Sequence, residues 1–264
     1  MHYTFVQEGI GRRLTMKGGR VATTFDLSGK SVLITGAARG LGRALAVGAA
    51  QAGAAVAAFD VDGALLGELR TCPSITTYVV DVVDRAAFMA AAGRIGRIDA
   101  IVNNAMLIRY DPIEAVDEAT IDRMVAIGIK GAVWGVQALL RHMDPAAGGV
   151  VLNLASPTAE RGIPTTAVYS MVKAAMGALT RTLAAELGPR RVRVNALAPG
   201  SIPTPGAVAI TPQEEYERRA MRIPLRRLGR EEDATYASLY LLSDAASFVS
   251  GEILHVDGGF LGSA

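Results

Sequence analysis

Seven short, continuously apolar runs recur along the chain after residue 28, and stretches with helical spacing separate them. The runs lie at 31–35, 54–59, 75–80, 98–103, 149–154, 191–197 and 252–256. The predicted helices lie at 41–52, 62–70, 84–94, 118–142, 166–187 and 231–242. Strands that are buried on both faces of a sheet are apolar throughout rather than alternating. The pattern therefore predicts one α/β domain with a seven-stranded parallel sheet covered by helices on both faces.

One segment after the sixth predicted strand interrupts this alternation. Residues 198–230 are rich in proline and contain no strand pattern, although 213–222 has the spacing of a short helix. Proline restricts φ and lacks a backbone N–H, so the start of the segment is expected to be irregular. Excursions of this length more often form binding loops than linkers. We therefore predict a substrate lid at about 203–222, with an inert surface insertion as the alternative.

The first 26 residues have no clear periodicity and are predicted to form an N-terminal arm, which leaves 27–264 as a single domain. Charged residues interrupt the arm, so it lacks the apolar core of a signal peptide. The longest apolar run, 44–59, is too short to cross a bilayer, and no membrane association is expected. Cys72 is the only cysteine, which excludes an internal disulfide and favours a cytoplasmic location.

Composition narrows the classes of function. Lysine and arginine number 27 against 25 acidic residues, a net charge of +2, and aromatic residues make up 5% of the chain. These values favour neither a basic surface for nucleic acid nor a platform for base stacking. No group of His and carboxylate residues has the spacing of metal ligands, so no metal is expected.

A glycine-rich turn follows the first predicted strand. The sequence TGAARGLG at 35–42 places Gly36 at the strand exit, Gly40 where the backbone can approach a phosphate, and Gly42 where helix and strand pack closely. The helix that opens at Leu41 offers free N–H groups and a partial positive charge to an anion. This strand–turn–helix context predicts a Rossmann-like, doubly wound domain that binds a dinucleotide.

Asp60 ends the second predicted strand, 24 residues after Gly36. A carboxylate at this place can accept hydrogen bonds from both ribose hydroxyls and repels a 2′-phosphate, so Asp60 favours NAD over NADP. Arg39 points the other way, because a guanidinium in the turn could hold a 2′-phosphate. The alternative role for Arg39 is that of a Coulombic partner for Asp60.

Further polar residues follow the third and fourth predicted strands, as Asp81-Val82 and as Asn103-Asn104-Ala105. Ligands of open α/β sheets bind at the carboxyl ends of the strands. Each polar residue could instead cap a helix or form a turn. Together, on one edge, they predict cofactor contacts from Asp81, Val82, Asn103 and Ala105.

Ser156 follows the fifth predicted strand, and thirteen residues later a helix carries Tyr169 and Lys173. Their i,i+4 spacing puts phenol and ammonium on one helix face, which is also what an ordinary amphipathic helix would do. An ammonium about 4 Å from a phenol is worth roughly 4 kcal/mol at an effective dielectric near 20, which predicts a lowered Tyr169 pKa. Such a phenol can exchange a proton with an alcohol or carbonyl oxygen, to which Ser156 can donate a hydrogen bond.

These features together resemble the short-chain dehydrogenase/reductase family from about residue 27 to 259. The resemblance rests on the glycine turn, Asp60, Asp81-Val82, Asn103–Ala105, Ser156, Tyr169, Lys173, Pro199-Gly200, Ile202, Thr204 and the VDGG of 256–259. It implies that Tyr169 is the acid/base, that Ser156 orients the substrate oxygen, and that Lys173 binds the nicotinamide ribose and lowers the Tyr169 pKa. It also implies contacts of Pro199, Gly200, Ile202 and Thr204 with the nicotinamide carboxamide and the phosphates.

Two positions depart from the family's pattern. Met106 stands where the family usually has glycine, and its side chain either narrows the pocket or points away. Gly128 stands where the family has an asparagine that kinks the helix and holds a water for proton relay. Glycine can supply the irregular backbone, so slower proton exchange is expected, with loss of activity as the alternative.

The predicted activity is NAD-dependent interconversion of a secondary alcohol (a polyol, sugar or cyclic alcohol) and a ketone. The alternatives are an NADPH-dependent 3-oxoacyl thioester reductase, which Asp60 disfavours, and a non-catalytic dinucleotide-binding protein, which only Gly128 favours. The lid has no cationic cluster aimed at a phosphate, which favours a small neutral substrate. The resemblance implies a homotetramer built on helices 118–142 and 166–187. Small residues there, such as Gly128, Gly131, Ala174 and Gly177, would allow close packing between subunits or within the chain.

Overall fold

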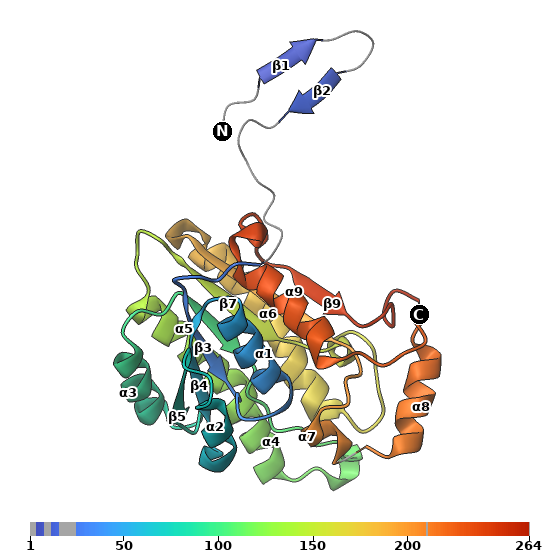
Figure 1. The fold of residues 1–264 in the computed structure, drawn as a ribbon. Helices are drawn as coiled ribbons and strands as arrows, with labels where there is room; N and C mark the ends of the chain where they lie inside the picture. Colours follow the sequence, from blue (N-terminus) through green and yellow to red (C-terminus); the bar gives the residue numbers. More distant parts are fainter. Residues whose placement is uncertain (1–3, 8–11, 16–24, 210, 264) are drawn as a thin grey trace.

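Seven parallel strands form one sheet in the order β5-β4-β3-β6-β7-β8-β9 (Figure 1). The strands are β3 (Ser31–Thr35), β4 (Ala55–Asp60), β5 (Ile75–Val79), β6 (Ala100–Asn103), β7 (Gly149–Leu154), β8 (Val192–Pro199) and β9 (Ile253–Val256). Every neighbouring pair is parallel. The strand order reverses between β3 and β6, as in a doubly wound sheet. The predicted α/β fold with seven parallel strands is confirmed. The computed structural model describes residues 4–7, 12–15, 25–209 and 211–263.

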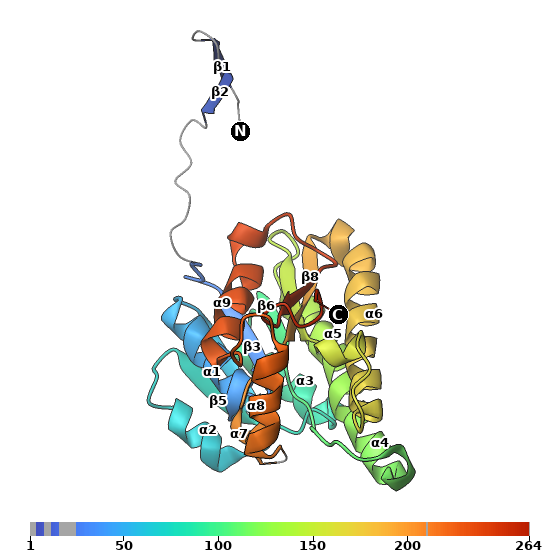
Figure 2. The same ribbon diagram turned by 90° about the vertical axis from the view of Figure 1, so that its right-hand side faces the viewer.

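Helices cover both faces of the sheet. They are α1 (Gly40–Gln51), α2 (Gly63–Leu69), α3 (Arg85–Ile95), α4 (Glu118–Val125), α5 (Gly131–His142), α6 (Ala167–Leu187), α7 (Pro205–Val208), α8 (Gln213–Arg222) and α9 (Glu231–Leu242). Short helical turns lie at Ile113–Ala115, Pro157–Ala159, Gly188–Arg190 and Asp244–Ala246. Helices α1 and α9 pack together on one face, while α3 and α5 pack together on the other. Figure 2 shows the two layers on opposite sides of the strands.

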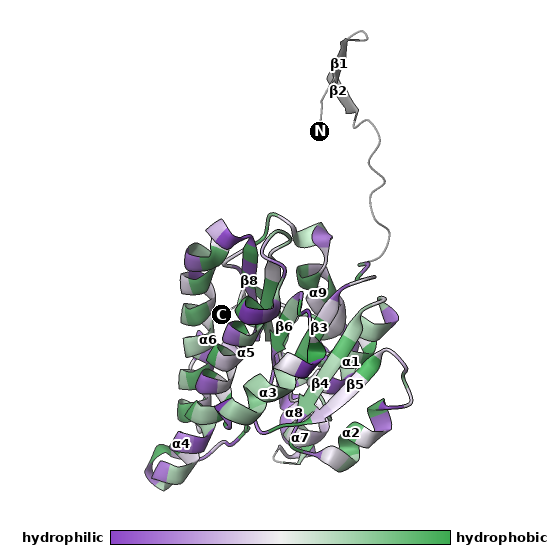
Figure 3. Cartoon of the chain, turned by 90° about the vertical axis from the view of Figure 1, so that its left-hand side faces the viewer, coloured by the Kyte–Doolittle hydropathy of each residue, from purple (hydrophilic) through white to green (hydrophobic). Residues whose placement is uncertain are grey.

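The core divides into two main clusters, one on each face of the sheet. On strand β3, Val32 and Ile34 pack into the cluster with α1 and α9, whereas Leu33 between them packs into the cluster with α3 and α5. All three are fully buried. In Figure 3, strands β3, β4 and β6 are coloured mainly as hydrophobic. Burial on both faces is the reason why these strands are continuously apolar in the sequence.

The predicted helix 118–142 contains a π-helical segment, Ala126–Lys130, between α4 and α5. Gly128 lies at its centre, where a Cβ would come within 2.4 Å of Val172 Cγ1 and 3.0 Å of Met106 Sδ. The expectation that glycine supplies an irregular backbone at this position is confirmed. By length and composition Glu118–His142 could span a membrane, but half of its most apolar window is buried inside the domain. That burial is typical of the core helix of a globular domain.

Two short strands pair antiparallel within the predicted N-terminal arm, β1 (Thr4–Gln7) and β2 (Arg12–Thr15). Four-residue strands carry too little periodicity to be recognised in a sequence, and sequence analysis predicted no regular element there. The other residues of 1–24 lie outside the described part of the chain.

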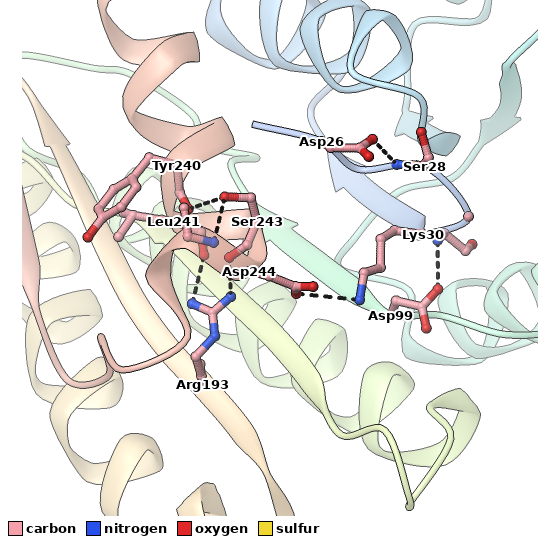
Figure 4. A network of polar contacts seen from close by, with 12 residues as sticks. Asp26, Ser28, Lys30, Asp99, Arg193, Tyr240, Leu241, Ser243 and Asp244 are labelled. Atoms are coloured by element: carbon pink, nitrogen blue, oxygen red, sulfur yellow. Dashed lines mark hydrogen bonds and ion pairs between the residues drawn. The ribbon is translucent and has the colours of Figure 1, made fainter. Parts of the chain in front are cut away.

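The amino edge of the sheet is held by a network of polar contacts (Figure 4). Arg193 at the start of β8 donates hydrogen bonds to the carbonyls of Leu241 (2.8 Å) and Ser243 (3.1 Å) at the end of α9. Lys30 forms an ion pair of 3.7 Å with Asp244 just beyond that helix. Carbonyls at a helix end lack intrahelical partners. Arg193 therefore fastens the end of α9 to the sheet.

Candidate active site

The glycine turn between β3 and α1 lies at the carboxyl edge of the sheet and is closely packed on two sides. Gly36 and Gly40 have φ values of +66° and +54°, which favour glycine. A Cβ at Gly36 would lie 2.8 Å from Ala105 Cα, and a Cβ at Gly40 would lie 3.2 Å from Thr204 Cβ. The structure therefore brings together three of the predicted cofactor segments: the turn, the loop after β6 and the start of the lid.

Asn104 and Thr35 hold the turn in this conformation. The Asn104 side-chain amide donates to the carbonyls of Thr35 (2.9 Å) and Gly36 (3.0 Å). The Thr35 hydroxyl in turn accepts the backbone N–H groups of Asn104 and Ala105, both at 3.1 Å. Sequence analysis placed Asn104 at this edge without listing it among the cofactor contacts, and it offered only a general turn role for the residue. The signal, Asn-Asn-Ala after a strand, is the same for both roles.

Asn103 is placed differently from its predicted role. Its side chain is buried and donates to Asn153 Oδ1 at 2.8 Å, and Asn153 donates to the Thr180 hydroxyl at 2.9 Å. The Asn103 amide thus belongs to a polar chain inside the domain. A cofactor contact at this position would have to come from the backbone.

The start of α1 is arranged to receive an anion. Its N-cap residue, Arg39, makes no side-chain capping bond, so the amides of the first turn, which include Leu41, have no side-chain acceptor there. Unpaired amides and the helix dipole both favour a phosphate. Arg39 itself is exposed.

Asp60 is fastened to the glycine turn by backbone donors. Its Oδ2 accepts from the Ala38 N–H at 2.9 Å, and its Oδ1 accepts from the Asp62 N–H at 3.1 Å. Arg39 forms no direct ion pair with Asp60 in the described part of the chain. Both side chains remain candidates for contacts with a ribose.

Asp81 and Val82 lie at the carboxyl edge as predicted, but their side chains have structural partners. The Asp81 carboxylate accepts from Arg123 of α4 at 2.9 Å and from the Val83 N–H at 3.0 Å. Burial raises the pKa of Asp81, but these hydrogen bonds outweigh it and hold the pKa below its ordinary value. Val82 is buried and packs against Gly131. Asp81 therefore places a carboxylate at this edge, whereas the Val82 side chain belongs to the core.

The structure brings Ser156, Tyr169 and Lys173 together at the carboxyl edge of the sheet. Ser156 follows β7, and the other two project from the first turns of α6. The Lys173 Nζ donates to the Leu154 carbonyl at 2.7 Å and lies 5.7 Å from the centroid of the Tyr169 ring. A side-chain hydrogen bond with Ser156 lowers the pKa of Tyr169. The three predicted catalytic side chains therefore lie close to one another.

The protonation of this group differs from the prediction. Burial raises the pKa of Tyr169 well above its ordinary value, and Tyr110 raises it further. Burial also lowers the pKa of Lys173 to about 8. The predicted lowering of the Tyr169 pKa is wrong for this arrangement, because removing a phenolate from water costs more free energy than the hydrogen bond with Ser156 returns. At neutral pH Tyr169 therefore holds its proton.

Thr158 orients Ser156, a role that sequence analysis did not assign. Its hydroxyl donates to Ser156 Oγ at 3.1 Å, and its backbone N–H approaches the same oxygen at 3.3 Å. An oxygen that accepts from one side has its own proton free to point elsewhere. Ser156 can therefore donate toward Tyr169 and a substrate. The local Ser-Pro-Thr pattern, typical of a hydroxyl-capped turn, is the only sequence signal.

Met106 and Gly128 meet one another inside the site. The Met106 sulfur faces the space where a Cβ at Gly128 would lie, and Val172 of α6 fills the same space from the other side. The Met106 side chain therefore packs toward the π-helical segment. A side chain at position 128 would displace both neighbours.

The Pro199–Thr204 segment runs along the edge from β8 to the glycine turn. The Gly200 N–H donates to the Val256 carbonyl at 3.0 Å, and a Cβ at Gly200 would lie 2.7 Å from Asp257 Cα. Ile202 is buried and packs on Gly229, so its side chain points into the domain. Thr204 is the member of the segment that touches the turn.

The lid continues from Thr204 as α7 and α8, and the helix predicted at 213–222 is present. On α8, Tyr216 is buried, and the Arg219 guanidinium carbon lies 5.6 Å from the centroid of its ring. In the loop after β6, the ring of Tyr110 meets that of Tyr169 edge-on, at 5.5 Å and 83°. These aromatic residues carry no recognisable sequence motif. Within the described ranges, no three His, Cys, Asp or Glu side chains gather as a metal site would need.

Comparison with known proteins adds a consistent picture. A family model described as enoyl-(acyl carrier protein) reductase matches residues 36–261. The chain is 35% identical over 238 residues to L-xylulose reductase of Bos taurus, covering 89% of this chain and 98% of that protein. It is 35% identical over 244 residues to 3-oxoacyl-(acyl-carrier-protein) reductase of Thermotoga maritima, covering 89% and 99%. The structure of a gluconate 5-dehydrogenase from Burkholderia cenocepacia with NADP and tartrate matches with a TM-score of 0.84 at 33% identity, covering 91% and 98%.

Proposed function

Because the chain belongs to the short-chain dehydrogenase/reductase family, we propose that it is an NAD-dependent oxidoreductase that interconverts a secondary alcohol and a ketone. The observation that carries the proposal is the convergence of Ser156, Tyr169 and Lys173 beside a cradle suited to a dinucleotide. The relatives described above are reductases and dehydrogenases by name, which supports an oxidoreductase acting on CH–OH groups.

The residues present fit a dinucleotide. The positive φ values and close contacts at Gly36 and Gly40 leave room for backbone but for no Cβ. The amides at the start of α1 would hold the pyrophosphate, and Asp60 would accept the ribose hydroxyls. When bound, the nicotinamide supplies or accepts the hydride. The protein supplies binding, orientation and the proton.

Proton transfer follows from the state of Tyr169. A phenol that keeps its proton at neutral pH can donate it to a carbonyl oxygen, which suits ketone reduction. Ser156, oriented by Thr158, donates a hydrogen bond to the same oxygen and stabilises the charge that develops on it. Lys173, held on the Leu154 carbonyl, lies close enough to stabilise the phenolate that remains. We therefore propose that Tyr169 is the proton donor when the enzyme reduces a ketone.

Asp60 supports a preference for NAD, since its carboxylate repels a 2′-phosphate. Arg39 is the residue that could overcome this preference, and the Burkholderia relative is a complex with NADP. Titration of the wild-type protein with each cofactor tests the proposal, with tighter binding of NAD expected. Asp60→Ala is expected to narrow or reverse the difference, and Arg39→Ala to widen it. Tighter NADP binding by wild type would contradict the proposal.

The activity itself is tested with a panel of sugars, polyols, secondary alcohols and their ketones, followed by NADH absorbance in both directions. We expect the wild-type protein to turn over at least one member of the panel, and we expect Tyr169→Phe to abolish this turnover. Tight NAD binding without turnover of any member would overturn the proposal and favour a non-catalytic dinucleotide-binding protein.

A 3-oxoacyl thioester reductase is the second candidate, because one of the similar proteins carries that name. The arginines of α8 do not support it strongly. Glu215 pairs with both Arg218 (3.0 Å) and Arg219 (3.1 Å), and α8 as a whole carries three glutamates against three arginines, so the helix has no excess positive charge. A 3-oxoacyl thioester turned over faster than any sugar or simple ketone would establish this alternative.

We also propose a homotetramer built on the α4–α5 and α6 helices, in a cytoplasmic enzyme. Three of the small residues considered for such an interface face inward instead. A Cβ at Gly128, Gly131 or Gly177 would meet Val172, Val82 or Ile253 of the same chain. Exposed apolar side chains on the same helices, Ile121 and Met171, support an interface in their place. Light scattering of the purified protein tests the subunit number.

A further inference from the structure

Tyr216 carries a buried hydroxyl group that has no hydrogen-bond partner in the part of the chain that the structure describes. The residue is 3% exposed, on the inner side of lid helix α8. Among the described residues its Oη has neither donor nor acceptor. Buried tyrosine hydroxyls usually have a partner. Leaving one without a partner costs roughly 1–3 kcal/mol. Because Tyr216 lies in the predicted lid, a bound ligand could supply the missing hydrogen-bond partner.

The surroundings of Tyr216 connect it to the reacting group. Tyr110 lies edge-on against Tyr169 at a centroid distance of 5.5 Å. Burial raises the pKa of Tyr110, Arg219 lowers it, and Tyr216 raises it, so these α8 side chains are near the Tyr110 phenol. The Tyr110 ring therefore lies against the proton donor on α6, and its phenol is within Coulombic range of Tyr216 on the lid. A substrate whose carbonyl meets Tyr169 would extend along Tyr110 toward the lid.

The charge around Tyr216 limits what that substrate can carry. Arg219, over the Tyr216 ring, is already paired with Glu215 through its Nε. A carboxylate or phosphate would have to compete with Glu215 for this guanidinium, and the Glu215 carboxylate would repel it. An apolar chain would leave the Tyr216 hydroxyl without a partner. A neutral hydroxyl group both donates and accepts, and so matches a phenol.

We propose that the Tyr216 hydroxyl binds a non-reacting hydroxyl of the substrate, so that the enzyme selects a neutral polyhydroxylated ketone or alcohol. This inference rests on the proposed oxidoreductase function and assigns its substrate class. Tyr110 forms the wall between the two ends of the substrate. Tyr216 acts on specificity and takes no part in proton transfer.

Tyr216→Phe tests the proposal, since it removes one oxygen and keeps the ring. The substrates are a five-carbon ketose and 2-pentanone, assayed with NADH. For the ketose, kcat/KM is expected to fall about 10- to 100-fold, mainly through a higher KM, because the variant no longer forms the hydrogen bond with the substrate hydroxyl. For 2-pentanone it stays within twofold. The matched control is Tyr236→Phe, which changes an exposed tyrosine of α9.

Two further readouts separate the possible failures. The Tm of Tyr216→Phe without substrate is expected to equal or exceed that of wild type, and a lower Tm would mean a structural partner and overturn the inference. An equal loss on both ketones, or no loss on the ketose, overturns it as well. If wild type turns over no member of the substrate panel, the oxidoreductase function fails, and the rise in Tm that a polyol causes in the presence of NAD then tests the hydroxyl contact by itself. Loss of that rise in Tyr216→Phe supports the hydroxyl contact, and an unchanged rise refutes it.

Discussion

The two edges of the sheet differ in how their polar groups are partnered. At the amino edge, Arg193 bonds two helix-end carbonyls, Lys30 pairs with Asp244, and Asp99 accepts the Ser31 N–H at 2.7 Å. Four buried side-chain polar atoms lack a partner in the described residues: Asn103 Oδ1, Trp134 Nε1, Ser201 Oγ and Tyr216 Oη. Three of them lie at the carboxyl edge: Asn103 ends β6, and Ser201 and Tyr216 belong to the segment that follows β8.

This difference separates stability from function. Satisfied polar groups hold an edge in one conformation, whereas unsatisfied groups lose free energy unless a ligand or a motion pairs them. The carboxyl edge also holds a buried lysine and an uncapped helix start, both costly without an outside partner. Substitutions at the two edges should therefore act on different measured quantities.

The largest effect is expected for Tyr169→Phe, at the carboxyl edge. Removal of the proton donor should lower kcat by at least about 10²- to 10⁴-fold, the usual contribution of a positioned acid. The free energy of unfolding should change little, because the phenol has few structural bonds. NADH oxidation with a ketone and urea denaturation measure the two quantities. Activity near that of wild type would show that another group supplies the proton.

Gly128→Asn is expected to destabilise the protein, although it restores a residue typical of the family. A Cβ there would lie 2.4 Å from Val172 Cγ1, and overpacking of this kind costs roughly 1–3 kcal/mol. Val172→Ala together with Met106→Gly should recover part of the loss. Urea denaturation compares the single and triple variants. Unchanged stability of Gly128→Asn would mean that the π-helical segment adapts freely.

Arg193→Met tests the amino edge. It removes two hydrogen bonds to buried carbonyls and should lower the free energy of unfolding by roughly 1–3 kcal/mol. Activity per folded molecule should stay constant, because the residue lies at the opposite end of the strands. Exposed Arg190→Met is the control. A fall in kcat without loss of stability would break the distinction between the two edges.

The smallest effect is expected from pH. Burial lowers the pKa of Lys173 to about 8, so its ammonium is present below that pH and is lost as pH rises through it. Because the charged form stabilises the phenolate that ketone reduction leaves on Tyr169, the reduction rate should fall several-fold above pH 8. Lys173→Arg should move this fall to higher pH. A profile unchanged in that variant would assign the ionisation to another group.

The predicted and observed elements agree best where the sequence has a strong apolar pattern. Strands β3 and β7 and helix α9 match their predicted ranges, because continuous apolar runs and helical spacing record the same burial that the structure shows. The arm strands β1 and β2 were missed, since four residues carry no detectable period. The π-helical segment was anticipated only as an irregularity at Gly128.

The sequence by itself determined the α/β architecture and the place of the glycine turn, and it singled out Ser156, Tyr169 and Lys173 as candidates, because these depend on local spacing along strands and helices. Only the tertiary structure decided the direction in which the Tyr169 pKa moves and the inward orientation of Asn103. It also decided the close approach of Gly40 and Thr204, and it left the Tyr216 hydroxyl without a partner among the described residues. Each of these depends on burial and on contacts between segments far apart in the chain, and no local pattern of residues records them.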